Sequence, residues 1–201
     1  MKSFKSKRKS IVSLMQAQAS ERTCRICLED FDTPESPFIT PCICTGSCKF
    51  IHLSCLRSWT DSKKQVQEDA GVKSYFWESL ECEICKSPFS QTVEAFGTQV
   101  EILEIERPNS QAYMIWESEV HGASKAIHVI NFAVRPMYMI GRRVSNEISI
   151  SDISVSREQA RVVYYETCKT VILYDLNSKF GTFQKIEGLF KVPRTPGLVP
   201  I

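Results

Sequence analysis

The sequence lacks any long apolar segment. Of its 201 residues, 43% are hydrophobic and 24% are charged, which is ordinary for a globular chain. No apolar run approaches the roughly 18 residues of a membrane-spanning helix. A secretory signal is also absent, because the basic start MKSFKSKRKS is followed only by the short apolar IVSLM. We therefore expect a soluble protein with no membrane partner, in the cytoplasm or nucleus, where clustered cysteines bind metal more often than they form disulfides.

The sequence also has little net charge. The formal value is +2 with every cysteine counted as neutral. Two zinc ions held by seven thiolates would bring it slightly below zero, so net charge gives no support to a nucleic-acid partner. Positive charges do gather in the first ten residues. We interpret residues 1–19 as a basic disordered tail, with nuclear targeting or contact with an acidic surface as the alternative.

Cysteine is abundant but unevenly distributed. Eight of the nine cysteines lie between Cys24 and Cys85, and only Cys168, which we interpret as a bystander, lies outside. The hydrophobic pattern changes near residue 111, after which short apolar runs alternate with polar turns. This change predicts two domains. The predicted organisation is a tail at 1–19, a zinc domain at 20–90, a linker at 91–110, a β-sandwich at 111–190 and a tail at 191–201.

Eight candidate metal ligands occur in four pairs. The pairs are Cys24 and Cys27, Cys42 and Cys44, His52 and Cys55, and Cys82 and Cys85. Pairs at these spacings let two side chains from one turn reach one tetrahedral zinc ion, so four pairs predict two Zn²⁺. A single zinc site or a disulfide cluster is the alternative, and the reducing compartment argues against disulfides. Cys48 is left over, either as a spare loop thiol or as a replacement for Cys44 or His52.

The order of these ligands, in CRIC, PCICTGSCKFIHLSCLRSW and CEIC, resembles the RING-CH (RINGv) zinc finger of ubiquitin ligases. The resemblance covers residues 20–90 and implies a cross-brace. One zinc would be held by Cys24, Cys27, His52 and Cys55, and the other by Cys42, Cys44, Cys82 and Cys85. Such zinc ions are structural, because protein side chains fill all their coordination positions. The 26 residues between Cys55 and Cys82 are long for this family, and we expect the extra DSKKQVQEDAGVKSY to be loop and helix extension.

The resemblance also implies a docking surface for a ubiquitin-charged conjugating enzyme (E2). Ile26, Trp59 and Pro88 are the apolar positions expected to touch that enzyme, and Lys86 is expected to contact ubiquitin. Simple packing is the alternative for Ile26 and Trp59. The same ligand order occurs in PHD fingers, which bind histone tails. The C-x-C second pair, with Gly46 and HLSCLRSW, favours the RING-CH type.

The second half of the chain contains short apolar runs rich in Val, Ile, Tyr and Phe between residues 112 and 186. This spacing is typical of an antiparallel sandwich. Three loops, IGRR at 140–143, DISVSREQA at 152–160 and DLNSKFGTF at 175–183, together resemble the forkhead-associated (FHA) domain, which binds phosphothreonine peptides. The family's closing strands are not visible after Ile186, so the sandwich is either incomplete or closed by a degenerate strand.

The FHA resemblance implies which residues bind the phosphopeptide. The matching positions are Arg142, Ser156, Arg157, Ser178 and Lys179. Arginine, lysine and hydroxyl groups suit this task because a phosphate favours charge-assisted donors. Two positions depart from the family. Gln159 replaces a histidine that braces the serine loop, and Phe180 replaces an asparagine that fixes the peptide backbone.

The chain is thus predicted to be an α+β multi-domain protein, with a small two-zinc cross-brace domain followed by an all-β sandwich. The resemblances imply a RING-type ubiquitin ligase (E3) that positions a charged E2 without a covalent intermediate and chooses phosphothreonine-containing substrates. The alternative is a non-enzymatic reader or scaffold that binds phosphopeptides.

Overall fold

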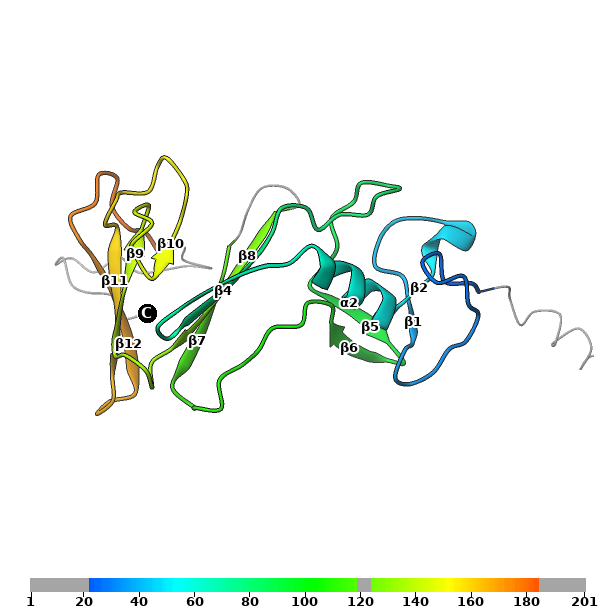
Figure 1. Ribbon diagram of the computed structural model, residues 1–201, viewed down its shortest axis with the longest axis horizontal. Coiled ribbons are helices and arrows are strands. Elements are labelled where there is room, and N and C mark those ends of the chain that lie inside the picture. The colour runs from blue at the N-terminus through cyan, green and yellow to red at the C-terminus, as the bar shows by residue number, and fades with distance from the viewer. Residues whose placement is uncertain (1–21, 119–123, 185–201) are drawn as a thin grey trace, which may run out of the picture. The chain divides into compact units, whose positions relative to one another are not determined.

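The structure is a computed structural model that describes residues 22–118 and 124–184, drawn as a ribbon in Figure 1. The predicted tails at 1–19 and 191–201 lie outside these residues. The chain divides into two compact units, each built from two separate stretches of sequence. The first unit contains the described residues up to 63 and residues 80–104, and the second contains residues 64–79 and those from 105 onward.

The first unit consists of short elements around one α-helix (Figure 1). They are β1 Phe38–Ile39, the 3-10 helix η1 Gly46–Lys49, β2 Ile51–His52, α2 Leu53–Ser62, β5 Thr92–Ala95 and β6 Thr98–Glu101. β1 pairs antiparallel with β2, and α2 follows β2 directly. β5 and β6 form an antiparallel hairpin within the segment predicted as a linker. Its two turn residues, Phe96 and Gly97, both have positive φ, as tight hairpin turns require.

Helix α2 buries one face, as its sequence predicts. Leu53, Leu56 and Thr60 are all buried, at the three- and four-residue spacing of a single helix face. On the next face Arg57 donates from Nη2 to the carbonyl of Glu101 at 2.7 Å. That bond connects the helix to the end of β6. Helix α2 is therefore held both by its buried apolar face and by this hydrogen bond.

The second unit contains two four-stranded sheets that share a core. Its strands are β3 Gln65–Asp69, β4 Val72–Trp77, β7 Tyr113–Glu117, β8 Lys125–Asn131, β9 Met137–Gly141, β10 Ile148–Ser149, β11 Ala160–Tyr165 and β12 Thr170–Asp175. One sheet has the order β3-β4-β8-β7 and the other β10-β9-β11-β12, and all pairs are antiparallel except β10 with β9. Val72 and Ile130 of the first sheet pack in one buried cluster with Tyr138, Ile140 and Val162 of the second. The predicted sandwich is confirmed, and the question of a closing strand after Ile186 falls outside the described residues.

The extra segment between the third and fourth ligand pairs is a β-hairpin, and the prediction of loop and helix extension was wrong. Helix α2 ends at Ser62, and the next residues form β3 and β4. Six residue pairs join β4 to β8, from Val72 with Ile130 to Trp77 with Lys125. Because all five residues of β3 are exposed, this strand reads as a loop in the sequence. The apolar residues of β4 place the hairpin in the sheet of the second unit.

A glycine allows the turn of this hairpin to pack closely against the core of the second unit. Gly71 has a φ of +92°, and a Cβ there would lie 2.0 Å from the Tyr138 hydroxyl. Its carbonyl accepts a 2.7 Å bond from the N–H of Asn131, whose own carbonyl accepts from the Tyr138 hydroxyl. A side chain at position 71 would therefore push apart the contact between turn and core.

We predict that a charge in β4 destabilises the second unit. This is expected even though β4 lies between two zinc-ligand pairs of the first unit in the sequence. Val72 is 2% exposed, whereas Val66, on β3 of the same hairpin, is 46% exposed. Val72→Asp should lower the free energy of unfolding of the second unit by at least about 3 kcal/mol, since it buries an unpaired carboxylate. Val66→Asp, the matched control, should change it by less than about 0.5 kcal/mol.

Denaturant unfolding followed by tryptophan fluorescence measures this effect. In a Trp59→Phe background the remaining tryptophans, Trp77 and Trp116, both belong to the second unit. The bound zinc should stay near two ions per chain in both variants under native conditions. Equal losses of stability for the two aspartate variants would contradict the placement of β4 in the core of this unit.

Candidate functional site

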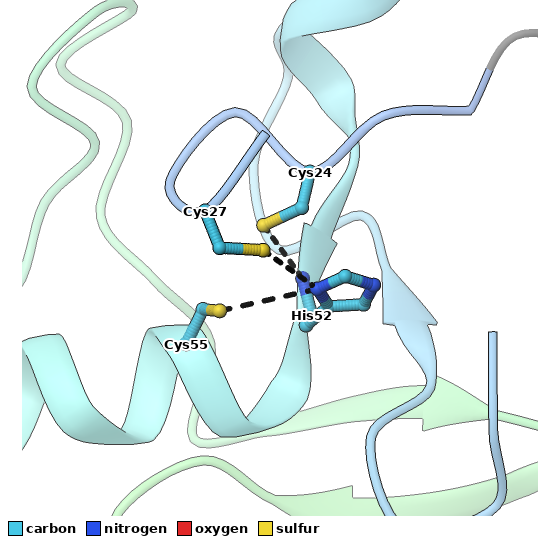
Figure 2. A group of neighbouring side chains, drawn as sticks. All are labelled: Cys24, Cys27, His52 and Cys55. Carbon is cyan, nitrogen blue, oxygen red and sulfur yellow. Dashed lines mark hydrogen bonds between the residues drawn. The ribbon is translucent and has the colours of Figure 1, made fainter. Parts of the chain in front are cut away.

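Eight cysteine and histidine side chains gather in two clusters of four. The first is Cys24, Cys27, His52 and Cys55, and the second is Cys42, Cys44, Cys82 and Cys85. Within each cluster the ligand atoms all lie within 4.8 Å of one another. Figure 2 shows the three sulfurs of the first cluster facing His52. These are the interleaved sets that the resemblance implied. Cys48 belongs to neither cluster and is exposed.

The two C-x2-C turns are built in the same way. The N–H of Leu28 donates to the carbonyl of Cys24 at 2.8 Å, and that of Lys86 donates to the carbonyl of Cys82 at 2.9 Å. Leu28 and Lys86 both have positive φ, 66° and 59°, which is uncommon for residues other than glycine. In each turn a backbone N–H also points at the first sulfur, from Ile26 to Cys24 at 3.4 Å in the first. Such donors stabilise a thiolate, so both turns are preorganised to hold a metal ion.

The ring of His52 is fixed in orientation and tautomer. It stacks between Phe31 and Phe38, with ring centroids 4.0 and 4.4 Å away. Its Nε2 lies 2.6 Å from the carbonyl oxygen of Phe31. A carbonyl can only accept, so Nε2 carries the proton and Nδ1 is free to bind a metal. Nδ1 is the atom that faces the sulfurs of Cys27 and Cys55, at 3.2 and 3.9 Å.

The thiols of the first cluster differ in acidity. Burial raises the pKa of Cys24, but backbone N–H groups of Cys27 and His52 outweigh it and lower that pKa to about 7. Burial raises the pKa of Cys55 to about 12, and the nearby Cys27 and Cys24 add to the rise. One thiolate thus opposes the ionisation of the next. A bound cation would favour the charged form of Cys55 beside the Cys24 thiolate.

The second cluster has the same property. The hydroxyl of Ser87, 3.1 Å from the sulfur, lowers the pKa of Cys85 to about 6. Burial raises the pKa of Cys44 to about 12, and hydrogen bonds with its neighbours Cys85 and Cys42 raise it further. Four sulfurs here, and three sulfurs with an imidazole in the first cluster, fit the soft tetrahedral coordination of Zn²⁺. Because the protein supplies four ligands in each, both sites are closed and structural.

Arg25 connects the two clusters and was not predicted from the sequence. It lies between Cys24 and Cys27 of the first cluster, but its guanidinium reaches the second. It is 3.5 Å from the Cys44 sulfur and 3.3 Å from the Cys82 sulfur, and it donates to the carbonyl of Cys48 at 2.8 Å. A site of four thiolates with one Zn²⁺ carries two excess negative charges, which Arg25 is placed to offset.

A small groove lies beside the clusters. Its volume is about 190 Å³, and Ile26, Trp59 and Ile84 are among its lining residues. Ile26 is 45% and Ile84 58% exposed, and Trp59 packs edge-on against Phe89 at 5.7 Å. Ile84 was not predicted, but its position directly before Cys85 repeats that of Ile26 before Cys27. Two predicted residues, Lys86 and Pro88, are exposed and lie outside the lining of this groove.

A second, basic cavity lies in the second unit, where three loops meet. Its volume is about 560 Å³, and Arg142, Ser156, Arg157 and Lys179 are among its lining residues. Arg142 donates its N–H to the carbonyl of Ser156 at 2.9 Å, and the Ser156 hydroxyl accepts from the N–H of Lys179 at 2.9 Å. Gly141 permits the close approach of the first two loops, because a Cβ there would lie 2.4 Å from the Arg157 carbonyl oxygen.

Comparison with known proteins agrees with both sites. The family model of the RING-variant domain (RINGv) matches residues 24–85, from the first ligand to the last, and that of the FHA domain matches residues 138–193. The chain contains a RING-variant domain and a forkhead-associated domain. Among the described residues no helix is both long enough and apolar enough to cross a membrane.

Curated relatives match around the RING-variant domain. "E3 ubiquitin-protein ligase MARCHF6" of Homo sapiens is 40% identical over 74 residues, which are 37% of this chain and 6% of that protein. "Probable E3 ubiquitin ligase SUD1" of Arabidopsis thaliana is 30% identical over 121 residues, 60% of this chain and 9% of the relative. "E3 ubiquitin-protein ligase MARCHF8" of Homo sapiens is 39% identical over 71 residues, 35% of this chain and 19% of the relative. The chain thus spans less than a quarter of each relative's length. No solved structure matches the chain.

In the FHA domain, Gln159 joins two of the loops. Its Oε1 accepts from the N–H of Ser156 at 2.9 Å, and its Nε2 donates to Ser178 at 2.8 Å and to the carbonyl of Gly181 at 3.0 Å. The Ser178 hydroxyl in turn donates to Asp175 at 2.6 Å and is not part of the cavity lining. The departure from histidine therefore preserves a brace behind the serine loop, and Ser178 is part of that brace.

The other departure, Phe180, changes the surface rather than the brace. Its ring is 58% exposed, and the ammonium of Lys179 lies 5.0 Å from the ring centroid. An aromatic ring cannot fix a peptide backbone with the two hydrogen bonds that an asparagine amide offers. It offers apolar area and a cation–π contact instead.

We predict that Arg25 controls the retention of zinc in the second cluster. Arg25→Gln should speed the chelator-driven release of one of two zinc ions by about tenfold, since loss of a partner outside the ligand set commonly weakens metal binding by that amount or more. Arg25→Lys keeps the positive charge but not the planar guanidinium with its several donors. Its rate of zinc release should therefore lie between those of the wild type and Arg25→Gln. Release is measured with a zinc-sensitive dye under excess chelator.

Arg22 supplies the control. It lies three residues before Arg25, contacts Asp32 at 3.8 Å and touches none of the ligand sulfurs. Arg22→Gln should release both ions at the wild-type rate. If Arg25→Gln also releases both at that rate, the guanidinium does not stabilise the cluster.

Proposed function

We propose that this chain is an E3 ubiquitin ligase of the RING type, in which the first unit docks a ubiquitin-charged E2. The observation that carries the proposal is a groove with exposed isoleucines in its lining, on a module whose zinc sites are closed. Closed sites leave no coordination position for water or substrate. The chemistry is then positional. The ligase holds the thioester of the E2 in a reactive geometry, and the gain in rate comes from orientation.

The groove supports this role by its residues. Ile26 and Ile84 project from the two rigid C-x2-C turns, and Trp59 projects from helix α2. Aromatic and aliphatic anchors on rigid elements are typical of interfaces whose binding energy is concentrated in a few residues. In the proposed complex Lys86, exposed apart from its contact with Glu81 at 3.5 Å, faces ubiquitin, and Pro88 lies at the margin of the E2 surface.

We predict that Ile26→Ala slows E3-stimulated discharge of charged E2 by about tenfold, because truncating a central apolar contact commonly costs more than 1 kcal/mol of binding. Discharge is followed as loss of the E2–ubiquitin thioester with free lysine as acceptor, over a panel of E2 enzymes. Ile43 supplies a matched control, since it also lies between two zinc ligands, is 75% exposed and lies outside the groove. Ile43→Ala should discharge at the wild-type rate.

Absence of any stimulation across the panel, with two zinc ions bound, would favour the alternative of a non-enzymatic scaffold. Equal rates for the two isoleucine variants would refute the groove as the docking surface while leaving ligase activity in place.

We further propose that the FHA domain selects substrates by binding phosphothreonine. The cavity at the loops supplies arginine and lysine charge and a serine hydroxyl, which are the groups that bind a phosphate. Among the described residues, no carboxylate forms an ion pair with Arg142 or Lys179. Arg142 and Ser156 contact the phosphate in this proposal, with Arg157 and Lys179 beside them. Ser178 contributes through the brace to Gln159.

We predict that a phosphothreonine peptide binds at least tenfold more tightly than the same peptide without phosphate, and that Arg142→Ala removes this difference. Fluorescence polarisation with peptide libraries measures it. Arg161 is the control, because it lies on β11 with its guanidinium 5.0 Å from the ring centroid of Tyr174 and outside the cavity. Arg161→Ala should bind as wild type does. Equal binding of the two peptides to wild type would refute phosphate recognition.

A further inference from the structure

A second basic hollow adjoins the cavity around Ser156. Its volume is about 370 Å³, and it is lined by Arg142, Arg143, Val144 and Arg157 alone. It shares its three arginines with the first cavity but has no hydroxyl group and no carboxylate in its lining. Every polar group that faces it is therefore a guanidinium or backbone.

The backbone holds these arginines in a fixed arrangement. Arg143 donates its N–H to the carbonyl of Arg157 at 3.1 Å, one residue along from the bond between Arg142 and Ser156. Asn146 is only 9% exposed. Its side-chain amide donates to the same Arg157 carbonyl at 2.8 Å, and its backbone N–H donates to the carbonyl of Arg143 at 3.0 Å. The hollow is thus built on a buried polar contact and does not depend on flexible side chains alone.

The charge around the two cavities exceeds that of one phosphate. Arg142, Arg143, Arg157 and Lys179 contribute four positive charges, and Glu158, paired with Arg143 at 2.6 Å, contributes one negative charge. No other acidic side chain of the described residues pairs with these four cations. A phosphothreonine brings about 1.5 to 2 negative charges. About one positive charge remains without a partner.

We propose that the second hollow binds a second anionic side chain of the same phosphopeptide, either a carboxylate or a further phosphate. This inference rests on the proposed phosphothreonine binding. Because the two cavities share three arginines, the second group lies within about three residues of the phosphothreonine, at roughly 3.3 Å of extended chain per residue. The ion pair of Arg143 with Glu158 competes only weakly with binding of this second anionic group, because both side chains are about half exposed.

The test uses the full zinc-loaded chain and synthetic peptides. Each peptide carries one phosphothreonine in a neutral background, with glutamate or phosphoserine placed in turn at each position from three before to three after it. A charge-matched peptide carries the same group eight residues away. We expect a gain in affinity of about fivefold at one or two near positions, with little gain from the remote group.

Val144 supplies variants at a position that lines the second hollow but not the first. It is 90% exposed and lines only the second. Val144→Glu should remove the gain by placing an anion among the arginines, whereas Val144→Gln, of equal length and no charge, should keep it. The readout is the ratio of affinities for the peptide with the near acid and the charge-matched peptide with the remote acid, because a general loss of positive potential weakens the binding of these two peptides alike.

The outcomes separate the two proposals. A gain with either acid that Val144→Glu abolishes supports the second site, and comparison of the two acids distinguishes carboxylate from phosphate. Tight binding of the singly phosphorylated peptide with no positional gain, or with a gain that Val144→Glu retains, overturns the second site alone. If the singly phosphorylated peptide binds no better than the plain one, phosphothreonine recognition fails and the second site fails with it.

Discussion

The interleaving of the two ligand sets is the constraint on which the first unit depends. Each cluster joins residues that are far apart in sequence, 24–27 with 52–55 and 42–44 with 82–85, so neither metal site can form before both of its segments are in place. The elements between them are short, with two-residue strands and one helix of ten residues. Such a unit has little apolar area to bury, and metal binding must supply much of its folding free energy. The same rigidity aligns the two turns that present the groove.

The path of the chain adds a second constraint. Between Cys55 and Cys82 the chain leaves the first unit, forms β3 and β4 in the sheet of the second and then returns. The last ligand pair is thus reached only through a strand with six residue pairs to β8. The sequence order of the two family domains does not reveal this exchange. A cut at residue 90, between the predicted domains, would leave β4 without β8 and expose Val72.

A residue's place could be predicted from the sequence where its own chemistry decided that place, but not where its surroundings did. Cysteine and histidine pairs at chelating distance have few other uses in a reducing compartment, so all eight ligands were predictable. The hairpin was not, because β3 is fully exposed and carries no apolar alternation. Arg25 was not, because nothing in CRIC tells a solvent-exposed arginine from one that reaches the sulfur of a residue 57 positions away. Long-range contacts of polar residues leave no period in the sequence.

The presence of Gln159 where the family has a histidine affects how the proposed phosphate site responds to pH. A histidine that braces the serine loop gains a proton near pH 6.5 unless its surroundings prevent it, and as an imidazolium it can no longer accept the N–H of Ser156. The amide of Gln159 has no titratable proton in this range, yet it accepts that bond and donates to Ser178 and Gly181 at once. The loop brace therefore stays intact across the range in which a phosphate changes its own charge, near pH 6. Any pH dependence of phosphopeptide binding would then originate in the ligand rather than in this brace.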